Sequence, residues 1–132
     1  MIEIAASWEL AWSSPLTEAN LWEMPMSEFG VERLNVTPVS GIRKRWVHEY
    51  PTMTDLLNDR PLTPVFIDEV GKTELRDFEH PEDALYVFGR YSYSPAFNEG
   101  RGELTVRIDS AKPGMMWPHQ ALTVVLYDRF CR

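Results

Sequence analysis

The stretch HPEDALYVFGRYSYSP, residues 80–95, limits the kinds of fold that this chain can adopt. A proline turn at 80–81 precedes an unbroken apolar run at 84–88, and the run stops at Gly89. This pattern predicts a buried strand that ends at the glycine and delivers a loop to the edge of a sheet. Taken alone, the stretch does not decide between a ligand-binding loop and the plain end of a strand.

A second unbroken apolar run, in TPVFIDEVG, predicts another buried strand at 64–68. Neither run alternates polar with apolar residues, and strands covered on both faces are typical of the parallel sheets of α/β proteins. Further strands are expected within 2–12, at 33–37 and, with clear alternation, at about 103–108.

Helix signals separate these strands. Ser14 is a candidate N-cap and Pro15 suits the first turn of a helix that Gly30 would end, with Pro25 expected to kink or split it. A long polar connection then leads to PTMTDLLND, which predicts a short helix. The segment WPHQALTVVLYDRF predicts a closing helix with Pro118 in its first turn.

The expected order is strand, helix, strand, helix, strand, strand, strand, helix. This order predicts an α/β fold with a single, mostly parallel sheet flanked by helices. With 132 residues, the chain is expected to form one domain over 1–132.

Composition restricts the classes of protein further. The hydrophobic fraction is 44%, and no run approaches the roughly 18 apolar residues of a membrane helix. The start of the chain lacks a basic signal-peptide region and carries Glu3 and Glu9, and the single cysteine is Cys131. These features predict a cytoplasmic protein without disulfides.

The net charge of −7 argues against indiscriminate nucleic-acid binding, because phosphate contacts need concentrated lysine and arginine. The run Arg43, Lys44 and Arg45 beside Trp46 is the best candidate for a local RNA-binding patch. A solvated surface loop is the alternative interpretation of the same run.

Several segments together carry a resemblance to a known family. Three parts of the sequence are similar, in order and spacing, to the cofactor motifs of the SPOUT methyltransferases. They are TPVFIDEVG, FEHPEDALYVFG, and LTVRIDS followed by WPHQALTVVLYDRF. SSPLTEAN with EFGVERLNVTP is similar to the opening of that family. The chain therefore resembles the small TrmH/SpoU-like members, which methylate RNA with S-adenosylmethionine.

The resemblance implies a C-terminal trefoil knot, a homodimer, and S-adenosylmethionine bound by the knotted loops after the buried strands. Loops at the carboxyl ends of parallel strands are where α/β sheets bind ligands. The cofactor-binding residues implied by the resemblance are Ile67, Asp68, Glu69, Phe88, Gly89, Arg90, Ile108, Asp109 and Trp117.

The chain departs from the family at positions that carry catalysis. Met24 or Met26 stands where the family has an arginine on its first helix, and Tyr91 replaces an acidic residue. The usual Ser-Leu-Asn before the last helix is Met115-Met116-Trp117. Two functions therefore remain: an RNA methyltransferase, with tRNA or rRNA as substrate, and a catalytically inactive SPOUT-derived protein that binds cofactor, RNA or another partner.

Two side chains are candidates for chemistry. His119, near the start of the closing helix, is a candidate general base because its ordinary pKa is close to neutral. Arg90 follows the strand-ending glycine and could bind a phosphate or carboxylate. Each has a plain surface role as the alternative. The widely spaced histidines support no metal site, and the apolar surface of the closing helix predicts dimerisation through it.

Overall fold

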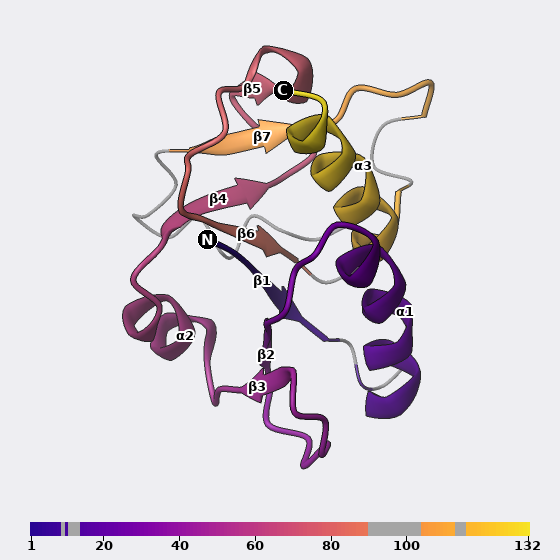
Figure 1. Ribbon diagram of the computed structural model, residues 1–132, viewed down its shortest axis with the longest axis vertical. Helices are drawn as coiled ribbons and strands as arrows, with labels where there is room; N and C mark the ends of the chain where they lie inside the picture. The colour runs from indigo at the N-terminus through magenta and orange to yellow at the C-terminus, as the bar shows by residue number, and fades with distance from the viewer. Residues whose placement is uncertain (9, 11–13, 90–103, 113–115) are drawn as a thin grey trace.

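The computed structural model describes the chain except for residues 9, 11–13, 90–103 and 113–115 (Figure 1). The elements follow one another as β1 (Ile2–Ser7), α1 (Pro15–Glu28), β2 (Leu34–Thr37), β3 (Val47–Glu49), α2 (Met53–Asp59), β4 (Thr63–Ile67), β5 (Thr73–Glu74), a short 3-10 turn (Leu75–Asp77), β6 (Ala84–Phe88), β7 (Thr105–Arg107) and α3 (Pro118–Phe130).

The strands form a seven-stranded sheet in the order β3-β2-β1-β6-β4-β7-β5, and every pair of neighbours is parallel. Strand β6 lies inside the sheet and pairs with β1 on one side and β4 on the other. The predicted single parallel sheet is confirmed, and the strand expected at 84–88 has the predicted bounds.

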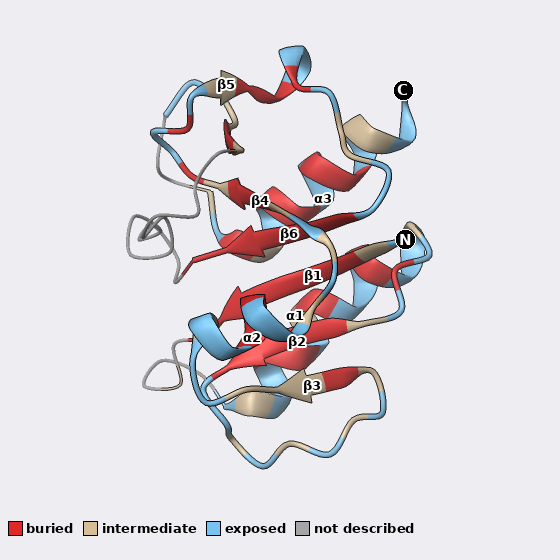
Figure 2. Ribbon diagram, turned by 90° about the vertical axis from the view of Figure 1, so that its left-hand side faces the viewer, coloured by how far each residue is buried: buried red, intermediate tan, exposed pale blue. Residues whose placement is uncertain are grey.

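The central strands are buried, as their red colour in Figure 2 shows, and different helices cover the two faces of the sheet. Tyr86 and Phe88 of β6 belong to the larger apolar cluster, which includes residues of α1 and α3. Leu85 and Val87 belong to the second cluster, with Leu56 and Leu57 of α2. Because neighbouring residues of a strand point to opposite faces, α2 lies on one face and α1 and α3 lie on the other. Double coverage explains the unbroken apolar run of β6.

Helix α1 begins as the sequence predicts but passes through its proline. Ser14 caps it, since the Ser14 hydroxyl accepts the backbone N–H of Thr17 at 3.2 Å. Of the two expectations for Pro25, a kink or a split, the split is wrong, because α1 is continuous from Pro15 to Glu28. Pro25 is buried and lies in the last turn, where its missing N–H removes one hydrogen bond near the helix end.

Two strands were not predicted. The connection expected to be irregular contains β3, and β5 follows the turn after β4. Both are short and lie at the two edges of the sheet. Neither has an apolar run, so only their pairing with β2 and β7 identifies them as strands.

Two partly buried polar contacts attach helices to the sheet. On the α2 side, Glu3 of β1 accepts two hydrogen bonds from the Arg60 guanidinium, at 2.8 and 2.6 Å, and one from Asn35. On the α3 side, His80 bridges the Tyr86 hydroxyl and the Asp128 carboxylate, both at 2.7 Å. The predicted turn at His80 therefore also fixes the C-terminal end of α3.

The turn after β4 packs tightly against β7. The Asp68 carboxylate accepts the backbone N–H of Val70 at 3.1 Å, and the Asp68 carbonyl accepts the N–H of Gly71 at 2.9 Å. A Cβ atom at Gly71 would lie 2.5 Å from the Val106 carbonyl carbon. This position therefore needs glycine because two backbones approach closely.

We predict that Gly71→Ala lowers the free energy of unfolding by about 1–3 kcal/mol, because the added methyl group must push the turn away from β7. Chemical denaturation measures the change. Glu69→Ala, at an exposed position in the same turn, serves as the control and is expected to stay within about 0.5 kcal/mol of the parent protein. Equal stability of the parent and the Gly71→Ala variant would contradict the close approach.

Candidate functional site at the carboxyl edge of the sheet

The carboxyl ends of the central strands meet at one edge of the sheet. Phe88 of β6 pairs with Ala6 of β1 and with Ile67 of β4, and Ile67 also pairs with Val106 of β7. From β1 the chain continues to β2 on one side, and from β6 it continues to β7 on the other. Divergence of the chain from adjacent parallel strands marks the ligand-binding crevice of α/β sheets.

The first turns of α1 and α3 border this edge and enclose a small cavity with the end of β1. Glu18 and Trp22 come from α1, His119 from α3, and Ser7 and Trp8 from the end of β1. The cavity measures about 10 Å³, close to the least space that one water needs. The described residues therefore form a packed wall of the edge rather than a pocket of cofactor size.

Two indole groups in this wall are buried donors. Trp8 and Trp22 are each 2% exposed, and no described residue accepts a hydrogen bond from either Nε1–H. The Trp22 ring is fixed edge to face against Phe88, with centroids 5.6 Å apart. A buried donor without an acceptor is costly, so a ligand or water that offers acceptor atoms here would be favoured.

His119 faces a buried carboxylate across the same cavity. Burial lowers the pKa of His119 below its ordinary value of 6.5, and the Glu18 carboxylate, 6% exposed, acts in the opposite direction. The lowered pKa keeps the imidazole neutral at pH 7, the form that can accept a proton. The ring of Trp117 lies edge to face against His119 at 5.8 Å.

The residues that the resemblance assigns to the cofactor have different surroundings. Ile67 and Phe88 are adjacent at the strand ends, and the buried Gly89 follows Phe88. Asp68 is buried and closes its own turn, whereas Glu69 is exposed. Arg90, like Tyr91 and Met115, lies outside the described residues.

The remaining assigned residues come from β7 and α3. Ile108 and Asp109 follow β7 and line a separate cavity of about 410 Å³ against the outer side of α3. Asp109 is exposed and accepts a hydrogen bond from the Arg107 Nε at 3.0 Å. Trp117, 48% exposed, lies instead beside His119 at the small cavity. The structure therefore separates Asp109 from Trp117.

Sequence reasoning missed the residues that surround His119. Glu18, Trp8 and Trp22 were not among the candidate residues predicted from the sequence. Only the packing of α1 against α3 brings them to one cavity. The recurrence of tryptophan at 8, 12 and 22 was the available signal, although position 12 lies outside the described residues.

Comparison with solved structures gives the class of fold. AviRb, a SpoU methyltransferase from Streptomyces viridochromogenes solved with AdoMet, matches 96% of this chain with a TM-score of 0.71 and 15% identity. A Bacillus anthracis protein assigned to the RNA methyltransferases matches 99% of this chain and 93% of its own, with a TM-score of 0.74 and 12% identity. The A. aeolicus TrmH/SpoU tRNA modifying enzyme matches with a TM-score of 0.72 and 14% identity.

The chain thus has the fold of the SpoU/TrmH methyltransferases, and the resemblance predicted from sequence is confirmed at the level of fold. It spans about 55% of the length of AviRb and 72% of that of the A. aeolicus enzyme. No protein-family model matches the chain. No curated protein sequence matches it either.

None of the helices among the described residues has the length and apolar character that crossing a membrane demands. Within the same part of the chain, no three histidine, cysteine or acidic side chains converge as metal ligands would.

We predict that His119 titrates below 6.5 and that Glu18→Gln lowers its pKa further, because the carboxylate stabilises the imidazolium. Ring-proton NMR across a pH series measures both values. Since the folded-state pKa lies below the unfolded one, protonation of His119 favours unfolding as the pH falls through about 6.5. Glu23→Gln, an exposed acid on the same helix, is the control and should leave the titration unchanged. A higher His119 pKa in Glu18→Gln would contradict the contact.

Proposed function

We propose that this protein is an S-adenosylmethionine-dependent methyltransferase that acts on RNA, either tRNA or rRNA. The observation that carries the proposal is the likeness of fold, over nearly the whole chain, to a SpoU methyltransferase solved with AdoMet. The arrangement of the strand ends supports it, since β1 and β6 diverge at the edge where α/β sheets bind nucleotides.

The cofactor would lie against the ends of β4, β6 and β7, near Ile67, Gly89 and Ile108. S-adenosylmethionine supplies an electrophilic methyl group on sulfur. Gly89 is buried and has no side chain, so its backbone can approach an adenosine closely. Asp68, Glu69, Phe88, Arg90, Asp109 and Trp117 remain proposed contacts from the resemblance alone.

The chain's own contribution to the reaction would be a proton acceptor. The RNA nucleophile must lose one proton as it attacks the methyl group, and the neutral His119 ring nitrogen can accept it. Glu18 would stabilise the imidazolium that forms. This pair would take the place of the family arginine, because Met24 is exposed on α1 and Met26 is buried, and neither can carry a proton.

The family's architecture completes the proposal. A trefoil knot would form in the C-terminal part of the chain, and a cytoplasmic location is expected. The outer side of α3 would form a homodimer interface, because Val124, Tyr127 and Phe130 are 37, 59 and 75% exposed.

A binding protein without catalysis is the second candidate function. It is favoured by one observation: in the sequence, apolar Met24, Met115 and Trp117 stand where the resemblance expects a polar arginine, serine and asparagine. Such a protein would keep the cofactor or RNA site and lack methyl transfer.

Calorimetry with S-adenosylmethionine and its demethylated product tests the first function. Binding of both, with methyl transfer to total cellular RNA, is the predicted result. No binding of either ligand would overturn the proposal, and binding without transfer would favour the second candidate.

We predict that His119→Ala lowers methyl transfer by about 10²–10⁴-fold while cofactor affinity changes little, because general-base catalysis is worth about that factor. Rates with radiolabelled cofactor and the calorimetric Kd measure the two effects. His48→Asn, on edge strand β3, is the matched control and should keep full activity. If the His119→Ala variant transfers methyl groups as fast as the parent, His119 is not the general base.

For the dimer, we predict a solution mass of twice 15.3 kDa by light scattering and a shift to monomer in Tyr127→Glu, which places a charge in the interface. Val39→Glu alters an equally exposed apolar residue away from α3 and should leave the mass unchanged. A monomeric parent protein would contradict the interface.

A further inference from the structure

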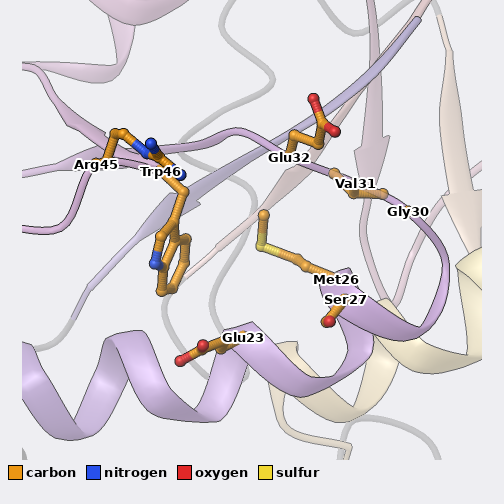
Figure 3. A pocket seen from close by; sticks show the side chains of 8 residues that line it. All are labelled: Glu23, Met26, Ser27, Gly30, Val31, Glu32, Arg45 and Trp46. Carbon is orange, nitrogen blue, oxygen red and sulfur yellow. The ribbon is translucent and has the colours of Figure 1, made fainter.

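A second hollow lies at the opposite, amino edge of the sheet. It is a groove of about 640 Å³ between the C-terminal half of α1 and the segments that lead into β2 and β3. Figure 3 shows the indole of Trp46 extending toward α1, where Glu23 and Met26 lie. None of the residues assigned to the cofactor or to His119 lines this groove.

The Trp46 indole is the aromatic part of the groove lining. Trp46 is half-buried and packs against the main apolar cluster, and its carbonyl accepts the backbone N–H of Leu34 at 2.9 Å. Met26 is buried beside it. An indole held in this way is suited to stack on a planar aromatic ligand.

The acids of the groove indicate which planar ligand fits. Glu23 and Glu32 are exposed and line the groove together with the indole. A carboxylate accepts hydrogen bonds and donates none, so it matches a base edge that carries adjacent donors. Guanine has two such donors, N1–H and the N2 amino group, whereas adenine places an acceptor at N1.

The third component is the positive run that precedes the tryptophan. Arg45 lines the groove, and Arg43 and Lys44 come just before it in the chain. In a chain with a net charge of −7, this local concentration of positive charge suits phosphate groups next to a bound base. The same positive charge would repel a lysine-rich peptide, which the indole and the acids could otherwise bind.

We propose that the amino-edge groove binds one guanine nucleotide of single-stranded RNA, with the base stacked on Trp46, its donor edge on Glu23 or Glu32, and a flanking phosphate at Arg45. The inference rests on the proposed function, because that function makes RNA the ligand of this protein. The groove would hold the substrate at a point away from the carboxyl edge, and so would select among RNAs by a base that is not itself modified.

Fluorescence anisotropy with short uridine oligonucleotides tests this site without cofactor. The oligonucleotides carry one central guanosine, inosine or adenosine. The parent protein should bind the guanosine oligonucleotide about tenfold more tightly than the adenosine one. Inosine should be intermediate, because it keeps N1–H and lacks the amino group.

Variants separate stacking from edge recognition. Trp46→Ala should weaken binding of all three oligonucleotides by about tenfold or more, and Trp46→Phe, which keeps a ring, should retain much of the affinity. The Glu23→Gln, Glu32→Gln double variant should remove the preference for guanosine over adenosine. Glu28→Gln, an exposed acid of α1 outside the groove, is the matched control and should keep that preference.

Equal affinity of the parent protein for guanosine and adenosine would overturn the inference. So would unchanged binding in a folded Trp46→Ala variant, an unchanged preference in a folded Glu23→Gln, Glu32→Gln double variant, or preference of the groove for a lysine-rich peptide over RNA. Calorimetry with S-adenosylmethionine on the same variants keeps the two proposals apart. A variant that loses the guanosine preference but still binds the cofactor would show an effect on the groove alone. A parent protein that does not bind the cofactor would contradict only the proposed function.

Discussion

Strand β6 is the element on which the rest of the structure depends. Each of its residues is buried, and it pairs in parallel with β1 on one side and β4 on the other. Parallel pairing places the carboxyl ends of these strands at one edge, and β1 delivers α1 to the same edge. The position of His119 against Glu18 follows, because α1 and α3 pack side by side on one face of this sheet.

Buried polar contacts specify how the helices attach to that sheet. The Glu3–Arg60 pair lies near the start of β1, and the His80 bridge joins Tyr86 of β6 to Asp128 of α3. Buried ion pairs often add little net stability, because desolvation offsets their attraction. Breaking one of them leaves an uncompensated polar group, so these contacts favour a single docking position for each helix.

The sequence predicted those parts of the fold that local patterns determine. The apolar runs at 64–68 and 84–88, the Ser14 cap and the proline start of α3 all required only neighbouring residues. Strands β3 and β5 were missed because they are short and are defined by pairing with distant segments. The predicted split of α1 at Pro25 was wrong because packing overrides the local preference against proline inside a helix.

The candidate site was predictable to a smaller extent. The position of His119 after the last strand pointed to the carboxyl edge, and the structure places His119 at the small cavity there. Its partners Glu18, Trp8 and Trp22 come from segments about 100 residues earlier, and no short-range pattern connects them. The assigned Asp109 faces another cavity, because the chain after β7 passes the outer side of α3.

The central claim is that a nucleoside cofactor binds where β4, β6 and β7 end. Titration of ¹⁵N-labelled protein with S-adenosylmethionine, followed by amide chemical shifts, tests it most directly. The predicted result is a set of saturable shifts at Ile67, Gly89 and Ile108, with α2 and the groove beside Trp46 unaffected. Shifts confined to the amino edge, or none at saturating cofactor, would contradict the claim.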